Sequence, residues 1–204
     1  MYELLVLALL MHWPLHAYRI VKIANEIIGP EEQISTGTLS SLLAKLERAG
    51  LISPADPGTA PFPGDRPSRV FAITTAGRER FLELMLDTSS HPGTYRRLFH
   101  IKALHLEFLA LESQLFLVEH YLAHCRQVLR SKQTDAQDVV GSPLKREHMS
   151  AALREGAMAL MRLKTEQWQL ELTWGQALRE RILSRLKRHR ETVSVTRGEA
   201  SDSH

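Results

Sequence analysis

The sequence predicts a mainly α-helical fold, in which a winged helix-turn-helix N-terminal domain precedes a C-terminal helical, coiled-coil-like dimerisation domain. Two observations lead to this prediction. Over residues 1–80, the patterns follow the order helix, helix, helix, strand, loop, strand, helix. After residue 100, apolar residues continue at alternating spacings of three and four over about four heptads.

Three helices are predicted before the first loop. Residues 2–11 are almost wholly apolar, and their scarcity of β-branched residues favours a buried helix over a strand. Residues 15–28 have helical spacing and lie between two prolines. Residues 36–49 place four leucines on one face and stop at Gly50.

A hairpin and a fourth helix complete this domain, which we place at residues 1–86. Residues 53–67 are dense in Pro, Gly and Asp and are predicted to be a loop. Short apolar segments at 51–52 and 68–73 flank this loop and are predicted strands. Thr74 or Thr75 is the expected N-cap of the next helix.

A second break at residues 87–94 precedes a predicted helical domain at 95–190 for dimerisation and effector binding. A second long helix is expected at about 145–190, and its apolar side faces either the first long helix or a partner chain. That side carries Leu153, Ala157, Leu160, Leu163, Leu170 and Trp174. Residues 191–204 are expected to be a disordered tail. The heptad seam favours a homodimer, although it could instead pack within one chain. The predicted dimerisation residues are Ile101, Leu104, Phe108, Leu111, Leu115, Val118 and Leu122.

Several segments resemble PadR-family transcription regulators. They are residues 2–7 (YELLVL), 14–18 (PLHAY), 34–39 (ISTGTL) and 69–78 (RVFAITTAGR). The resemblance is specific over residues 2–80. It implies a homodimeric repressor that binds an inverted repeat and is released by an effector or partner. The chain departs from the family at Ser40 and Phe71, where members commonly have Tyr.

Double-stranded DNA is the partner that the third predicted helix suggests independently of the resemblance. Small hydroxyl side chains at its start allow close approach to a major groove. Ser35 is its expected N-cap, and its first-turn N–H groups suit a phosphate. A solvated amphipathic helix is the alternative. The candidate DNA-binding residues are Ser35, Thr36, Thr38, Ser41 and Lys45, with Lys22 on the preceding helix and Arg66 and Arg69 flanking the wing.

Two other groups of residues are candidate ligand sites. The family resemblance suggests Trp168 and Trp174 as candidates for binding a small aromatic effector, although packing is the commoner role of such residues. His120 and His124 have metal-ligand spacing beside Cys125, but a third ligand at fixed spacing is missing. We therefore expect no metal and no cofactor.

Composition and missing motifs exclude several classes of protein. A single cysteine among 204 residues excludes an intramolecular disulfide, and no apolar run approaches a membrane span, so a cytoplasmic protein is expected. No phosphate loop or catalytic constellation is evident, which argues against an enzyme. Residues 1–80 carry eight Lys and Arg against eight Asp and Glu. This neutrality leaves a protein-interaction module without sequence-specific DNA binding as the alternative function.

Overall fold

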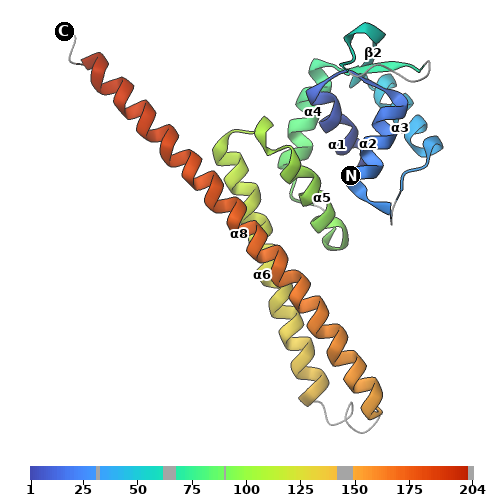
Figure 1. The fold of residues 1–204 in the computed structure, drawn as a ribbon, viewed down its shortest axis with the longest axis vertical. Coiled ribbons are helices and arrows are strands. Elements are labelled where there is room, and N and C mark those ends of the chain that lie inside the picture. The colour runs from blue at the N-terminus through green and yellow to red at the C-terminus, as the bar shows by residue number, and fades with distance from the viewer. Residues whose placement is uncertain (31–32, 62–67, 90, 142–148, 202–204) are drawn as a thin grey trace. The chain divides into compact units, whose positions relative to one another are not determined.

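The computed structural model of the chain describes residues 1–30, 33–61, 68–89, 91–141 and 149–201, and only the backbone of 92, 136–141 and 192–201. The architecture is mainly α-helical with one small sheet, as predicted. The chain divides into two units, Met1–Phe108 and Leu109–His204 (Figure 1). This division falls later than the break expected at residues 87–94.

The first unit is built around α1. Its helices are α1 (Tyr2–His12), α2 (Ala17–Ile28), α3 (Thr36–Arg48), α4 (Thr75–Leu86) and α5 (Pro92–Leu104). Contacts of α1 with α2, α4 and the strand β3 (Val70–Ile73) explain why the α1 sequence is apolar on every side. All side chains from Leu4 to Leu10 are buried. The three helices predicted before the wing are confirmed, except that the second begins at Ala17 rather than at residue 15.

A three-stranded antiparallel sheet has the order β1 (Leu15–His16), β3, β2 (Ile52–Ala55). The strands β2 and β3 form the predicted hairpin, with Ile52 opposite Ile73. The prediction of helix at residues 15–16 is wrong, because Leu15 pairs with Phe71 in the sheet. The partner strand lies far along the chain, so no local pattern marks this short strand.

The hairpin passes into α4 through Thr74 and Gly77. The Thr74 hydroxyl accepts a hydrogen bond from the Gly77 N–H (3.0 Å) and donates to the Gly50 carbonyl (2.7 Å). Thr74 is therefore the N-cap, one of the two predicted positions. A Cβ atom on Gly77 would lie 2.0 Å from the Leu51 carbonyl oxygen, so the close approach of helix and strand requires glycine.

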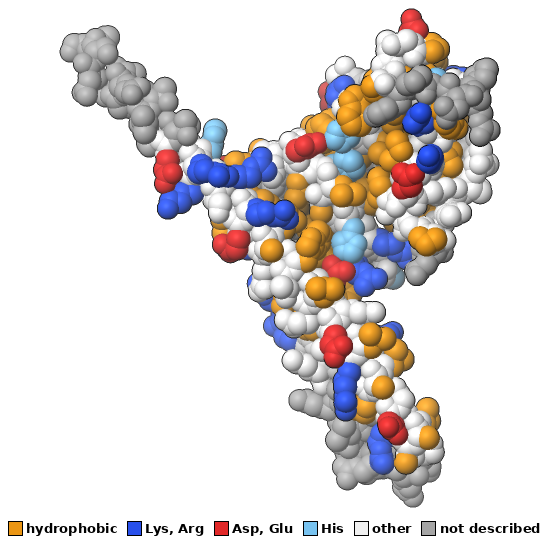
Figure 2. Space-filling view, viewed as in Figure 1, with side chains coloured by type: hydrophobic (Ala, Val, Ile, Leu, Met, Phe, Trp, Pro, Cys, Tyr) orange, Lys and Arg blue, Asp and Glu red, His pale blue; other side chains and the backbone are white. Residues whose placement is uncertain are grey.

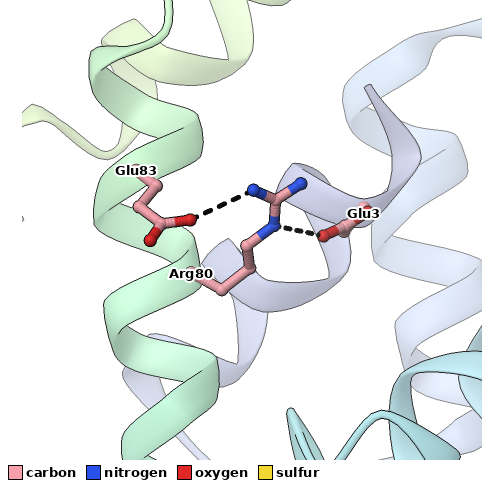
Figure 3. Close-up of polar contacts among 3 residues, drawn as sticks. All are labelled: Glu3, Arg80 and Glu83. Carbon is pink, nitrogen blue, oxygen red and sulfur yellow. Dashed lines mark hydrogen bonds and ion pairs between the residues drawn. The ribbon is translucent and has the colours of Figure 1, made fainter.

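An ion-pair cluster links α1 to α4 (Figure 3). The Arg80 guanidinium on α4 donates from Nε to Glu3 on α1 (2.8 Å) and from Nη1 to Glu83 one turn along α4 (3.1 Å). These side chains are partly exposed, so the cluster orients the two helices more than it stabilises them.

The chain turns between α5 and the second unit. The Lys102 side chain is buried and its ammonium donates to the Asp87 carbonyl at the end of α4 (2.5 Å). A 3-10 turn, η3 (Leu106–Phe108), follows α5. The predicted seam from Ile101 to Leu122 is therefore wrong as a single helix. Residues 105–110 contain neither Pro nor Gly, so the apolar spacing continues across a turn that the sequence does not mark.

The second unit is a helical hairpin of α6 (Leu111–Gly141) and α8 (Ala151–Ser201), which run antiparallel and side by side (Figure 1). Tyr121 on α6 donates to Glu171 on α8 (2.8 Å), and Arg179 pairs with Glu119 (3.1 Å). At Gly175 the helices approach closely, because an added Cβ would lie 2.8 Å from Leu122.

The far end of α8 differs from the sequence prediction. The α8 backbone is helical to Ser201, although residues 191–204 were expected to be disordered. No proline interrupts residues 191–201, which explains how the helix can continue. Residues 202–204 lie outside the described part of the chain.

Candidate nucleic-acid interface

The start of α3 is an exposed polar surface with a side-chain cap. Ser35 is its N-cap: the hydroxyl oxygen accepts a hydrogen bond from the Thr38 N–H (3.1 Å) and lies 2.9 Å from the Thr38 hydroxyl. The cap leaves other first-turn N–H groups directed out of the helix end. The structure confirms the predicted cap, and this geometry suits a phosphate oxygen.

Asn25 holds the connection between α2 and α3. Its side-chain amide donates to the Ile34 carbonyl (3.1 Å), and its carbonyl oxygen accepts from the Ile34 N–H (2.7 Å). This pair of bonds fixes the residue immediately before the Ser35 cap. The sequence analysis missed Asn25. Its position near the end of α2, four residues before the positive-φ Gly29, is the signal that could have indicated it.

The two faces of α3 separate as the sequence predicted. Leu39, Leu43 and Leu46 are buried against the unit. The opposite face is exposed and carries Thr38, Ser41 and Lys45, and Ser35 and Thr36 at the start of the helix are exposed as well. Lys22 on α2 and Ser40 on α3 are also exposed. Thr38, Ser41 and Lys45 thus share one accessible face of α3.

Of the two wing arginines, Arg69 lies within the described residues. Arg69, at the start of β3, forms an ion pair with Glu47 on α3, and its guanidinium lies over the Phe71 ring, 4.9 Å from the centroid. Arg69 therefore links the wing base to α3, which the sequence did not indicate. Arg66 lies outside the described residues.

The predicted dimerisation residues have unequal exposure. Ile101, Val118 and Leu122 are buried, whereas Leu104 is 59% exposed. Exposed leucines instead mark α8, at Leu153, Leu160, Leu163 and Leu170. The α8 leucines were predicted to be its apolar side, facing either α6 or a partner chain. Their exposure in the single chain leaves this side unpartnered within the described residues.

The two candidate effector tryptophans lie within the hairpin. Trp168 meets His124 edge-on at 5.5 Å between centroids, and Trp174 meets Tyr121 at 6.2 Å. Both contacts join α8 to α6, which is the packing role weighed above. A cavity of about 560 Å³ lies between the same helices, but neither tryptophan lines it. Its lining residues are Glu119, Leu122, Arg126, Gln176, Arg179 and Glu180.

Cys125 is buried and His124 is half-buried on α6. Burial raises the pKa of the Cys125 thiol to about 11, which disfavours the reactive thiolate. Burial also lowers the pKa of His124. In the described part of the chain, no three His, Cys, Asp or Glu side chains form a group suited to a metal ion. Among the same residues, no helix is both long and apolar enough to cross a bilayer.

The helices α1, α2 and α3 and the hairpin of β2 and β3 define a winged-helix domain within the first unit. The third of these helices has one exposed face. Residues 6–83 match the family model of the transcriptional regulator PadR-like family. The match confirms the resemblance over the winged domain. A search of curated proteins finds no sequence match.

Solved structures of related proteins give a weaker likeness. Bacillus subtilis PadR in complex with operator DNA is 18% identical, with 88% of this chain and 96% of that chain covered and a TM-score of 0.38. The same protein in complex with p-coumaric acid is 18% identical, with 88% and 97% covered and a TM-score of 0.37. The Vibrio cholerae virulence activator AphA is 17% identical, with 90% and 99% covered and a TM-score of 0.37.

Proposed function

We propose that the protein is a homodimeric transcriptional repressor that binds an inverted repeat in double-stranded DNA through α3. The observation that carries the proposal is the exposed N-terminal face of α3, capped by Ser35 and held by Asn25. Hydroxyl groups of Thr38 and Ser41 would meet base edges or phosphates, and Lys45 would neutralise a phosphate. Repression would follow from occupation of a promoter, as the family resemblance implies.

The dimer is proposed to form through α8 rather than through the predicted seam. Leu153, Leu160, Leu163 and Leu170 lie within about one side of the helix, because they are spaced seven, three and seven residues apart. Each is at least half exposed in the single chain. Burying four leucines in a partner would be worth several kcal/mol, at roughly 1.5–3 kcal/mol for each. Two winged domains would then be held for the two half-sites.

A small aromatic effector remains part of the proposal for Trp168 and Trp174. Both rings are half-buried and form edge contacts across the α6–α8 hairpin. A ligand that separated these edges would alter the hairpin and thereby the dimer. Titration of full-length protein with aromatic carboxylates, read by tryptophan fluorescence, tests this role. A signal that survives in Trp168→Phe and Trp174→Phe proteins would contradict it.

Selection from a random duplex library tests DNA recognition without knowledge of the operator. We expect an inverted repeat with half-site centres about one or two turns apart to be enriched, and affinity for it to fall steeply with salt. Lys45→Gln should weaken binding, whereas Lys164→Gln, an equal charge change at an exposed position on α8, should not.

Failure to enrich any sequence, with protein that is folded by circular dichroism, would contradict the proposal. It would instead favour the protein-interaction module. Repression is tested separately, with a reporter gene placed behind the enriched sequence. Increased reporter expression when the protein is produced would contradict repression and indicate an activator.

A further inference from the structure

Positive charge on this chain is concentrated in one short segment of α8. Residues 181–190 carry five Lys and Arg and neither Asp nor Glu, a formal charge of +5. The whole chain has a formal charge of +3, so all the other residues together sum to −2. The winged domain is neutral over residues 1–80, as counted above. The charge of this segment therefore exceeds the net positive charge of the whole protein.

The structure displays this charge on the surface. Arg181, Arg185, Lys187, Arg188 and Arg190, which we call the α8 basic patch, are all exposed. Figure 2 shows Lys and Arg side chains gathered on α8 beside its grey C-terminal end. Ile182 and Leu186 are the buried residues of the same segment and hold it in the hairpin. The patch is thus mounted on a packed helix.

The contacts of Arg185 and Lys187 neutralise little of their charge. The Arg185 guanidinium donates to Gln114, a neutral side chain (3.4 Å). Lys187 lies 3.9 Å from Glu191, but both side chains are mostly exposed, so that pair is worth little. Arg179, by contrast, pairs with both Glu119 and Glu180 and is excluded from the patch.

We infer that the α8 basic patch binds the phosphate backbone of duplex DNA, as a second site separate from α3. Arg181, Arg185 and Arg188 are spaced four and three residues apart, so they form a row along one helix face. Such a row can contact successive phosphates, and each contact releases counterions without reading sequence. The patch would supply the sequence-independent affinity that a neutral winged domain lacks. This inference extends the proposed function to non-specific DNA.

The test uses full-length protein and a fluorescent duplex that lacks the enriched repeat, with affinity measured over a salt series. Replacing Arg181, Arg185 and Arg188 together by Gln should reduce the slope of log K against log salt by about two to three. Affinity at low salt should fall at least about tenfold. Gln and Arg have similar helix propensity, so circular dichroism should be unchanged.

The matched control replaces Arg154, Arg162 and Lys164 by Gln, with the same loss of charge elsewhere on α8. An equal decrease in slope in this control, or no decrease in the patch variant, would overturn the inference. Binding of the patch to anionic phospholipid vesicles in place of the duplex would also overturn it.

The Lys45→Gln variant separates this inference from the proposed function. If Lys45→Gln no longer binds the selected repeat and the patch variant keeps the wild-type salt slope, the inference about the patch is refuted and the proposed function stands. Binding of non-specific duplex through the patch, without any enriched sequence, would refute the proposed regulator and leave the patch standing.

Discussion

Arg69, at the base of the wing, forms an ion pair with Glu47 on α3 and lies over the Phe71 ring. The Arg69 side chain, which was predicted to reach DNA, is therefore already paired with a carboxylate. An exposed pair of this kind contributes at most about 1 kcal/mol, so a DNA phosphate can compete with Glu47. Phe71, one of the two departures from the family, provides the ring beneath the guanidinium.

This contact predicts that Glu47 conceals the contribution of Arg69 to DNA binding. Arg69→Gln alone should lower affinity less than Lys45→Gln, because Arg69 must first leave Glu47. Glu47→Gln should raise affinity several-fold, and in that background Arg69→Gln should cost as much as Lys45→Gln. Fluorescence anisotropy on one duplex measures all four proteins. Glu26→Gln is the control for removing an exposed acid, and an equal gain there would refute the competition.

Gly77 is predicted to tolerate no side chain. In Gly77→Ala the added Cβ would meet the Leu51 carbonyl oxygen, which is backbone and cannot move freely. We expect a loss of about 1–3 kcal/mol in the stability of the winged unit, as for other overpacked sites. Thermal unfolding by circular dichroism measures this loss. Gly156→Ala on α8 is the control: an added Cβ there has open space, so the change should be neutral or stabilising by up to about 1 kcal/mol.

His105 predicts a loss of stability in acid. Burial, and then the neighbouring His12, lowers its pKa to about 4, and its Nδ1 lies 3.2 Å from His12 Nε2. His12 also faces Glu107 at 3.7 Å. The unfolded chain, with a His105 pKa of about 6.5, binds more protons than the folded chain between these values. Stability is therefore complete above about pH 6.5 and decreases towards pH 4, by about 2 kcal/mol at pH 5.

Urea unfolding between pH 5 and pH 7 checks this dependence. The His105→Gln protein should lose most of the change seen in the wild type over that range. The control His189→Gln alters an exposed histidine on α8 and should keep the wild-type dependence. A wild-type profile that is flat between pH 5 and pH 7 would show that His105 titrates normally.

The exposed leucines of α8 predict where a dimer can be broken. Replacing Leu160 and Leu163 by Glu should convert the dimer to a monomer, because two charges would enter an apolar interface. Light scattering after size exclusion gives the mass, with circular dichroism to confirm that the helices persist. Gln169→Glu with Thr173→Glu adds the same charge to another exposed face of α8 and should leave a dimer. Monomeric wild-type protein at micromolar concentration would contradict this interface.

Local sequence signals predicted the helices and the hairpin of the winged unit. Local signals sufficed there: the leucine stripe of α3, the Ser35 and Thr74 caps, and the apolar segments that became β2 and β3. These features depend on neighbouring residues, so periodicity and capping chemistry identify them. The candidate residues on α3 followed from the same pattern, because a helix that buries one face exposes the other.

The features that depend on distant residues are evident only in the tertiary structure. The strand β1 exists because Leu15 meets Phe71, and Arg69 is held because Glu47 lies beside it. The heptad spacing did not reveal the turn after Leu104, since each segment keeps an apolar face of its own. Packing of α8 on α6 then buried Leu122 and left Leu160 exposed. Pairing and burial are properties of the folded chain, and apolar spacing alone does not specify which partner a face will meet.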